Sequence, residues 1–136
     1  MANYECATRT NYFKVKDAKS FKSLIAQTLA GDTVDVFTKK DGNQTLYGFG
    51  CLSSIDGLPD NGEANYDAWL HQLQNIVDDD DAIIIMETGH ENLRYVSGYL
   101  TVITSKAIKF RELETVALEI AKNLLNNKNY TTQCIY

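Results

Sequence analysis

Residues 82–104 read AIIIMETGHENLRYVSGYLTVIT. An apolar start, a polar centre and a second run of alternating side chains form the pattern of two strands joined by a turn. Residues 82–86 show so little alternation that they predict a central strand covered on both faces. Residues 94–104 predict the strand that pairs back across a turn at residues 89–93. This hairpin indicates a fold built around a sheet.

The rest of the chain alternates between strand and helix patterns. Strand patterns cover residues 10–16, 33–38 and 44–55, with a hairpin turn at Asp41-Gly42. Helix patterns cover residues 18–30, 65–77 and 110–126, and Asp17 is placed to cap the first of these helices. Residues 56–65 hold the single proline among turn formers and predict a surface loop, and residues 127–136 predict a flexible tail.

In chain order these elements run β-α-β-β-α-β-β-α. The first six have the ferredoxin-like order, and an extra strand and helix follow. We therefore predict an α+β fold, in which helices pack on an antiparallel sheet. The length of 136 residues suits one domain, so a single domain is expected over residues 1–136.

The chain is acidic, with a formal net charge of -5. Such a chain repels a phosphate backbone and approaches basic surfaces readily, so we expect a basic protein partner and no direct binding to nucleic acid or membrane. Three widely spaced cysteines without a CxxC pair favour reduced thiols and a cytoplasmic location. Neither a signal peptide nor a membrane-spanning run is predicted.

Alternation sorts the side chains of residues 94–104 into two faces. One face, with Val96, Leu100 and Val102, is expected to pack under helices. The opposite face is expected to carry exposed aromatic side chains. With the aromatic positions of the other strands, these tyrosines are Tyr12, Tyr47, Tyr95 and Tyr99.

An aromatic, polar-edged sheet face can anchor a protein partner or stack bases. Because Lys and Arg do not interleave with these tyrosines, the pattern favours a protein over RNA. The alternative is that the last helix or a second subunit covers this face, since the apolar arc of residues 110–126 is broader than one sheet face requires. The glycines Gly48 and Gly50, which alternate with Tyr47, are expected to lie under helices.

Two polar groups are further candidates. The acidic run Asp78, Asp79, Asp80 and Asp81 can mimic phosphates to a basic partner, or it can simply be a solvated loop. The turn of the opening hairpin carries the second group, which can act in acid/base chemistry or clamp an anion, or can form ordinary loop salt bridges. This group consists of Glu87, His90, Glu91 and Arg94.

Motifs for catalysis and for metal binding are missing from the sequence. The histidines His71 and His90 stand on separate elements without HExxH spacing, and no GxSxG elbow or phosphate-binding glycine loop occurs. We therefore expect no catalytic residue, no metal and no cofactor.

Residues 9–13 read RTNYF, and residues 89–99 read GHENLRYVSGY. With these segments the chain resembles small acidic proteins carried by bacterial phages and mobile elements, among them anti-CRISPR and other anti-defence inhibitors. The resemblance implies a non-enzymatic inhibitor that occupies a basic nucleic-acid-binding surface of a host defence protein, and it assigns no role to single residues. Two alternatives stay open: a small-molecule-binding protein or enzyme that uses the Glu87–Arg94 group, and a homodimer formed through the last helix.

Overall fold

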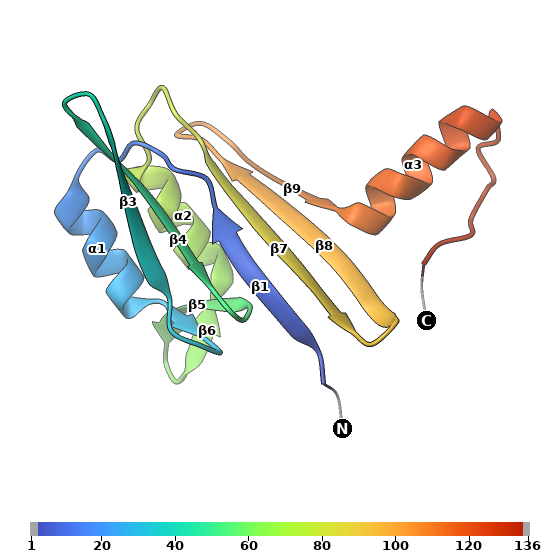
Figure 1. The fold of residues 1–136 in the computed structure, drawn as a ribbon, viewed down its shortest axis with the longest axis horizontal. Helices are drawn as coiled ribbons and strands as arrows, with labels where there is room; N and C mark the ends of the chain where they lie inside the picture. The colour runs from blue at the N-terminus through green and yellow to red at the C-terminus, as the bar shows by residue number, and fades with distance from the viewer. Residues whose placement is uncertain (1–2, 135–136) are drawn as a thin grey trace.

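The computed structural model describes residues 3–134, which fold into three helices and nine strands. In chain order these elements are β1 (Glu5–Thr10), α1 (Ala18–Gln27), β2 (Leu29–Ala30), β3 (Asp35–Asp41), β4 (Gln44–Cys51), β5 (Ile55–Asp60), β6 (Glu63–Asn65), α2 (Tyr66–Ile76), β7 (Ile83–Glu91), β8 (Arg94–Ile103), β9 (Ile108–Glu112) and α3 (Leu113–Leu125). The main sheet has the order β3-β4-β1-β7-β8-β9 and is antiparallel throughout (Figure 1). The fold is α+β, as the sequence predicts.

The centre of the main sheet has the ferredoxin-like arrangement. β1 lies between β4 and β7, so α1 connects β1 to β3 across one intervening strand, and α2 connects β4 to β7 across β1. β8 and β9 extend the sheet beyond β7. The prediction of a single extra strand is wrong, because Ile108 and Phe110 alternate with charged residues at strand spacing, and α3 begins only at Leu113.

The two helices that cover the sheet begin at capping residues. The Asp17 carboxylate accepts bonds from the backbone N–H groups of Lys19 and Ser20, both at 3.3 Å, as the sequence predicts. Asn65 caps α2 through a 2.9 Å bond from the Ala68 N–H. α1 ends at Gln27, earlier than expected, because the next residues form β2 and pair with β5.

The core lies between these helices and the sheet and is dominated by aromatic rings. Phe49 has no exposed surface, and its ring lies 6.3 Å from that of Phe13, 6.2 Å from that of Phe21 and 5.8 Å from that of Trp69. The indole N–H of Trp69 donates to the Thr28 hydroxyl at 2.9 Å, so its polar atom is satisfied.

The first strand lies earlier in the chain than predicted. β1 ends at Thr10, and Phe13 and Val15 make only isolated bridges to other elements. The inward-facing positions of β1 include Thr8 and Thr10, whose hydroxyls bond to backbone groups, which offsets the cost of burying them. Hydropathy alternation cannot reveal a strand whose buried face is polar.

The prediction of a surface loop at residues 56–65 is also wrong. Its residues form the hairpin β5-β6, closed by Asn61 and Gly62, which have φ angles of 53° and 84°. Positive φ at both positions is the geometry that favours an Asn-Gly pair in a two-residue turn. This hairpin and β2 form a small second sheet of three strands.

The main sheet has a covered face and an open face. α1 and α2 cover the side that carries Phe49, Ile83, Ile85 and Ile103. The other side, which we call the open face, carries apolar side chains that the strand pattern predicted to be buried. They are Ile84, Met86, Val96, Leu100 and Val102, of which Met86 is 54% exposed, Val96 44% and Leu100 37%.

The prediction of burial on this side is wrong because alternation shows which residues share a face, not which face the helices cover. Met86 pairs with Leu100, and both point away from α1 and α2. For the same reason Gly48 and Gly50 do not lie under helices. A Cβ on Gly50 would lie 2.7 Å from the Thr8 carbonyl oxygen, so this glycine permits close approach of the β1 backbone.

α3 stands apart from the other helices, beyond the β9 edge of the sheet (Figure 1). None of its residues is buried. Residues 127–134 follow without regular structure, and the last two residues of the predicted flexible tail lie outside the described part of the chain. Over residues 3–134, every helix is too short or too polar to span a lipid bilayer.

Candidate functional site

α1 and α2 leave part of the covered face bare, and this part forms a groove beyond the first turn of α2. We call it the tyrosine groove. Its inner end is a cavity of about 200 Å³, whose lining includes Tyr66, Glu87, Tyr99, Thr101 and Phe110. Tyr99 also lines the adjoining outer end, of about 680 Å³, together with Tyr4, Glu91, Arg94, Tyr95, Ser97 and Glu114.

Packing holds the tyrosines of the groove in place. Tyr99 stacks on Phe110 of the neighbouring strand, with ring centroids 6.0 Å apart and an angle of 16° between the planes. The Tyr4 hydroxyl and the Ser97 hydroxyl are 2.5 Å apart. Tyr66 is the first residue of α2, and its ring lies 5.4 Å from that of the buried Trp69. Tyr4, Tyr66 and Tyr99 are therefore each held by a neighbouring side chain.

The charge of the groove is predominantly negative. Glu87, Glu91 and Glu114 contribute carboxylates, against the single guanidinium of Arg94. Burial raises the pKa of Glu87 above the ordinary carboxyl value. Burial also raises the pKa of Tyr66, an effect that a hydrogen bond with Thr101 partly offsets. An acidic, aromatic-lined hollow is chemically suited to a cationic group.

The raised pKa of Glu87 gives a pH-dependent prediction. A carboxyl whose pKa is higher in the folded chain binds more protons when folded, so its contribution to stability falls as pH rises from the unfolded value, near 4.5, through the folded value. Glu87→Gln removes the titrating group and therefore this pH-dependent loss of stability. We expect the stability of the variant relative to the wild type to increase between pH 4.5 and 7, as measured by urea denaturation.

Tyr4, Tyr66 and Cys6 lie near Glu87, and burial raises the pKa of each above an ordinary value that is already well above that window. Their titration therefore does not obscure the effect. A matched Glu63→Gln variant, on an exposed hairpin, serves as the control. If the stability difference between Glu87→Gln and the wild type were the same at pH 4.5 and pH 7, the raised pKa of Glu87 would be contradicted.

The structure separates the four predicted tyrosines. Tyr95 and Tyr99 line the groove and are 51% and 37% exposed. Tyr47 is only 8% exposed and lies in the core, with its ring 5.3 Å from that of Phe21. Tyr12 lies beside Arg9 and Lys39, whose cationic groups are 5.7 and 5.8 Å from its ring. The expectation of one exposed face that includes Tyr47 is wrong, because α1 covers that part of the sheet.

The predicted polar group of the hairpin is divided between the two faces. Glu87, Glu91 and Arg94 line the tyrosine groove. His90 instead pairs with Glu5 and lines a shallow depression with Thr88 and Val96 on the open face. Among residues 3–134 no ion pair or side-chain hydrogen bond joins these four residues to each other. A histidine-centred acid/base cluster is therefore not assembled here.

The turn itself is shorter than the predicted residues 89–93. β7 continues to Glu91, which pairs with Arg94, and the turn consists of Asn92 and Leu93. A bulge interrupts the pairing near this end, and Tyr95 has a φ of 51°. This conformation turns Tyr95 toward the groove, 5.8 Å from the Arg94 guanidinium.

The acidic run Asp78–Asp81 lies at the opposite end of β7. Lys14 bonds to Asp80 at 2.8 Å and Lys16 to Asp79 at 3.1 Å, and these lysines lower the pKa of both carboxyls. Asp81 accepts a 2.8 Å bond from the backbone N–H of Lys14. β7 alone spans about 27 Å from Ile83 to Glu91, and the run lies before Ile83, so it is not part of the groove.

Tyr4, Tyr66, Thr101 and Phe110 are groove residues that sequence reasoning missed. The helix pattern places Tyr66 on the core face of its helix. One signal was available: Tyr66 directly follows the helix cap. A helical side chain points back over the preceding turn, and a residue of the first turn has none, so its side chain extends beyond the helix end. Tyr4 and Phe110 gave no comparable signal, since neither β1, which Tyr4 directly precedes, nor β9, which contains Phe110, was predicted.

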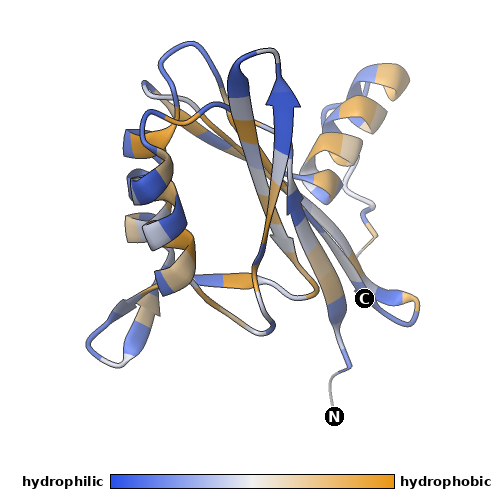
Figure 2. Cartoon of the chain, turned by 60° about the vertical axis from the view of Figure 1, so that its left-hand side comes forward, coloured by the Kyte–Doolittle hydropathy of each residue, from blue (hydrophilic) through white to orange (hydrophobic). Residues whose placement is uncertain are grey.

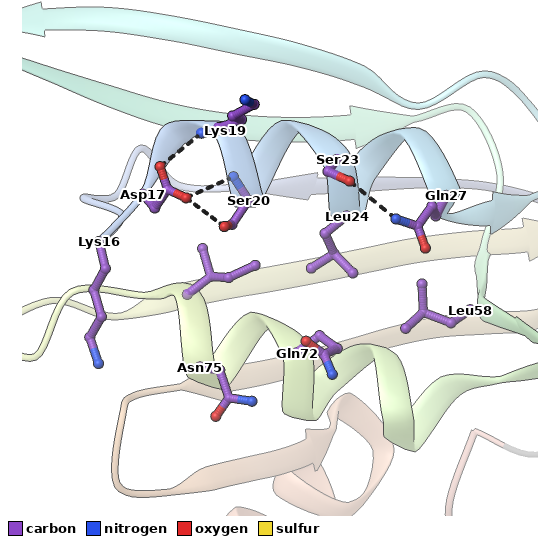
Figure 3. A pocket seen from close by; sticks show the side chains of 11 residues that line it. Lys16, Asp17, Lys19, Ser20, Ser23, Leu24, Gln27, Leu58, Gln72 and Asn75 are labelled. Carbon is purple, nitrogen blue, oxygen red and sulfur yellow. Dashed lines mark hydrogen bonds between the residues drawn. The ribbon is translucent and has the colours of Figure 1, made fainter.

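A second hollow of about 740 Å³ lies between α1 and α2 (Figure 3). Asp17 accepts a 2.6 Å bond from the Ser20 hydroxyl, and Gln27 donates to the Ser23 hydroxyl at 3.2 Å. These bonds serve α1 itself, so we place the candidate site in the tyrosine groove. Over the described residues, no three His, Cys, Asp or Glu side chains gather closely enough to hold a metal ion.

Comparison with known proteins adds no relative: the chain matches no protein-family model, no curated protein and no solved structure.

Proposed function

We propose that the protein is a non-enzymatic binding module that takes basic side chains of a partner protein into the tyrosine groove. The observation that carries this proposal is the lining of the groove, where carboxylates from Glu87, Glu91 and Glu114 stand among exposed tyrosine rings. A guanidinium or ammonium group gains both from a carboxylate and from the face of an aromatic ring.

The overall charge supports the same class of partner. A net charge of -5 attracts a basic surface over long range and speeds its association. Within this proposal, the protein acts as an inhibitor from a phage or mobile element, and it covers the basic surface with which a host defence protein holds nucleic acid. The resemblance of residues 9–13 and 89–99 supports this setting.

The experiment uses an arginine-rich peptide as the probe and measures its binding by fluorescence anisotropy. We expect Glu87→Gln/Glu91→Gln to weaken binding about tenfold or more, which corresponds to about 1.4 kcal/mol. The matched control is Asp79→Asn/Asp80→Asn, which changes the net charge equally but lies at the far end of β7. It should change affinity far less, because it alters only the long-range field.

Added salt should weaken peptide binding to the wild type, since the attraction is electrostatic. Two results would contradict the proposal. One is equal loss of binding in the groove variant and the control, and the other is binding that does not respond to salt.

A small-molecule site is the second candidate, favoured by the enclosed inner cavity at Glu87. Its ligand would be a small organic cation, recognised by the Glu87 carboxylate and the rings of Tyr66 and Tyr99. N-acetyl-arginine amide distinguishes the two candidates. If this single residue binds as tightly as the peptide, the cavity alone accounts for recognition and the small-molecule function is favoured.

A further inference from the structure

α3 is an amphipathic helix, and much of its apolar stripe stays exposed in the part of the chain that the structure describes. Its residues Leu113, Ile120, Leu124 and Leu125 are between 52% and 82% exposed. The first turn rests on the sheet, where a Cβ on Gly98 would lie 3.1 Å from Leu113, and the rest of the helix projects away (Figure 2). A helix of 13 residues is marginal in water by itself, because its stability comes mainly from packing.

The open face of the sheet is the second unpartnered apolar surface. Met86 on β7 pairs with Leu100 on β8, and Ile84 pairs with Val102, so four aliphatic side chains form one strip at the centre of the sheet. Ile84, Met86 and Leu100 are 39%, 54% and 37% exposed. A contiguous apolar strip in the middle of a soluble sheet marks an interaction site.

The chain exposes more surface than a compact monomer of its mass. The accessible surface is 9053 Å², whereas a compact monomer of 15.3 kDa exposes about 7,100 Å² by the usual scaling. The excess, about 1,900 Å² per chain, is larger than the roughly 800 Å² per partner that a standard stable interface buries. The surplus is therefore sufficient for a permanent dimer.

We infer that α3 of each chain packs on the open face of a second copy, so that two chains form a two-fold dimer. The helix stripe and the sheet strip have matching apolar character. Within one chain α3 reaches only the near end of the open face, at Val96 and Gly98, because it follows β9 without a linker and then leads away from the sheet (Figure 1). In a two-fold arrangement each chain supplies both surfaces, and both contacts form at once.

Charge does not oppose this contact. The apolar strip is flanked by Arg9, which pairs with Met86 across β1 and β7, and by Lys109, which pairs with Val102 across β8 and β9. Although each chain is acidic overall, the side chains that flank this contact are therefore basic, and carboxylates of the two chains are not brought together by these positions. The tyrosine groove lies on the other side of the same strands, and α3 contributes Glu114 of its first turn to the groove's outer end. The proposed contact uses the later turns of α3, so it does not rest on the proposed function.

Sedimentation equilibrium at about 10 μM chain tests the inference, because interfaces of this size have dissociation constants of micromolar or below. The wild type should sediment with twice the 15.3 kDa mass of one chain. Met86→Lys on the sheet and Ile120→Glu on the helix should each halve that mass without changing the circular dichroism spectrum. Leu52→Lys, at a position 79% exposed and outside both surfaces, should remain a dimer.

An equimolar mixture of Met86→Lys and Ile120→Glu chains tests the geometry. In the mixed dimer one helix–sheet contact is unmodified, and the other brings the introduced ammonium group against the introduced carboxylate, so the dimer mass should return. A monomeric wild type, a dimer that survives either substitution, or a mixture that stays monomeric would overturn the inference. If Met86→Lys instead weakens peptide binding in a monomeric chain, the open face belongs to the partner protein.

Discussion

Replacing Phe49 with alanine should lower the free energy of unfolding by about 3–5 kcal/mol, the cost typical of removing a large aromatic side chain from a packed core. Phe49 has no exposed surface and contacts rings from both covering helices and from the segment after β1. Its removal leaves a cavity that the surrounding rings cannot fill, because each is held by other neighbours. Urea denaturation at neutral pH measures the loss.

Leu52→Ala is the matched control for this substitution. Leu52 follows β4 directly and is 79% exposed, so the change should alter stability by no more than about 0.5 kcal/mol. If Phe49→Ala cost no more than about 1 kcal/mol, the aromatic cluster would not be the core of the fold.

Gly57→Ala should destabilise the chain by about 2–4 kcal/mol, from backbone strain together with loss of a helix cap. Gly57 has a φ of 125°, which side-chain-bearing residues rarely adopt. A Cβ there would overlap the Asn65 carbonyl group and lie 2.7 Å from the Tyr66 backbone nitrogen. Asn65 caps α2 and Tyr66 lines the tyrosine groove, so the substitution should also weaken peptide binding.

Gly42→Ala separates the two causes of this loss. Gly42 also has a positive φ, of 63°, but a Cβ at this position meets no heavy atom within 4 Å. Its cost should be only the left-handed penalty of about 1–2 kcal/mol, with peptide binding unchanged. Equal effects of the two substitutions, measured by urea denaturation, would show that the contact with Asn65 is unimportant.

The elements that could be predicted from sequence are those with local signals. Asp17 marks the start of α1, and the Asp41-Gly42 pair marks the β3-β4 turn, because both depend on a few adjacent residues. β1 could not be predicted, since its buried threonines form their hydrogen bonds with distant segments: the Thr8 hydroxyl donates to the Ser53 carbonyl, and the Thr10 hydroxyl accepts from the Phe49 N–H. The sequence also could not show which face of the sheet the helices cover, because aliphatic and aromatic residues occur on both faces.

The candidate site was predictable only in part. Tyr95 and Tyr99 were placed together because they share one strand, and the structure brings them to one groove. Tyr47 does not join them, contrary to the prediction, because α1 packs over the β4 end of that face. His90 lies on the opposite face from Glu87 because β7 continues to Glu91, and residues three apart on a strand point to opposite faces. The predicted turn at residues 89–93 hid this alternation.

The bulge at the end of the β7-β8 hairpin also determines which residues of β8 face the groove and which face the open side of the sheet. Tyr99 belongs to the groove and Leu100 to the open face, so a slip of one residue in pairing would exchange the two surfaces completely. The extra residue is absorbed beside Tyr95, before the regular pairing from Ser97 onward. The bulge and the two-residue turn therefore set the register that keeps Tyr99 and Leu100 on their respective faces.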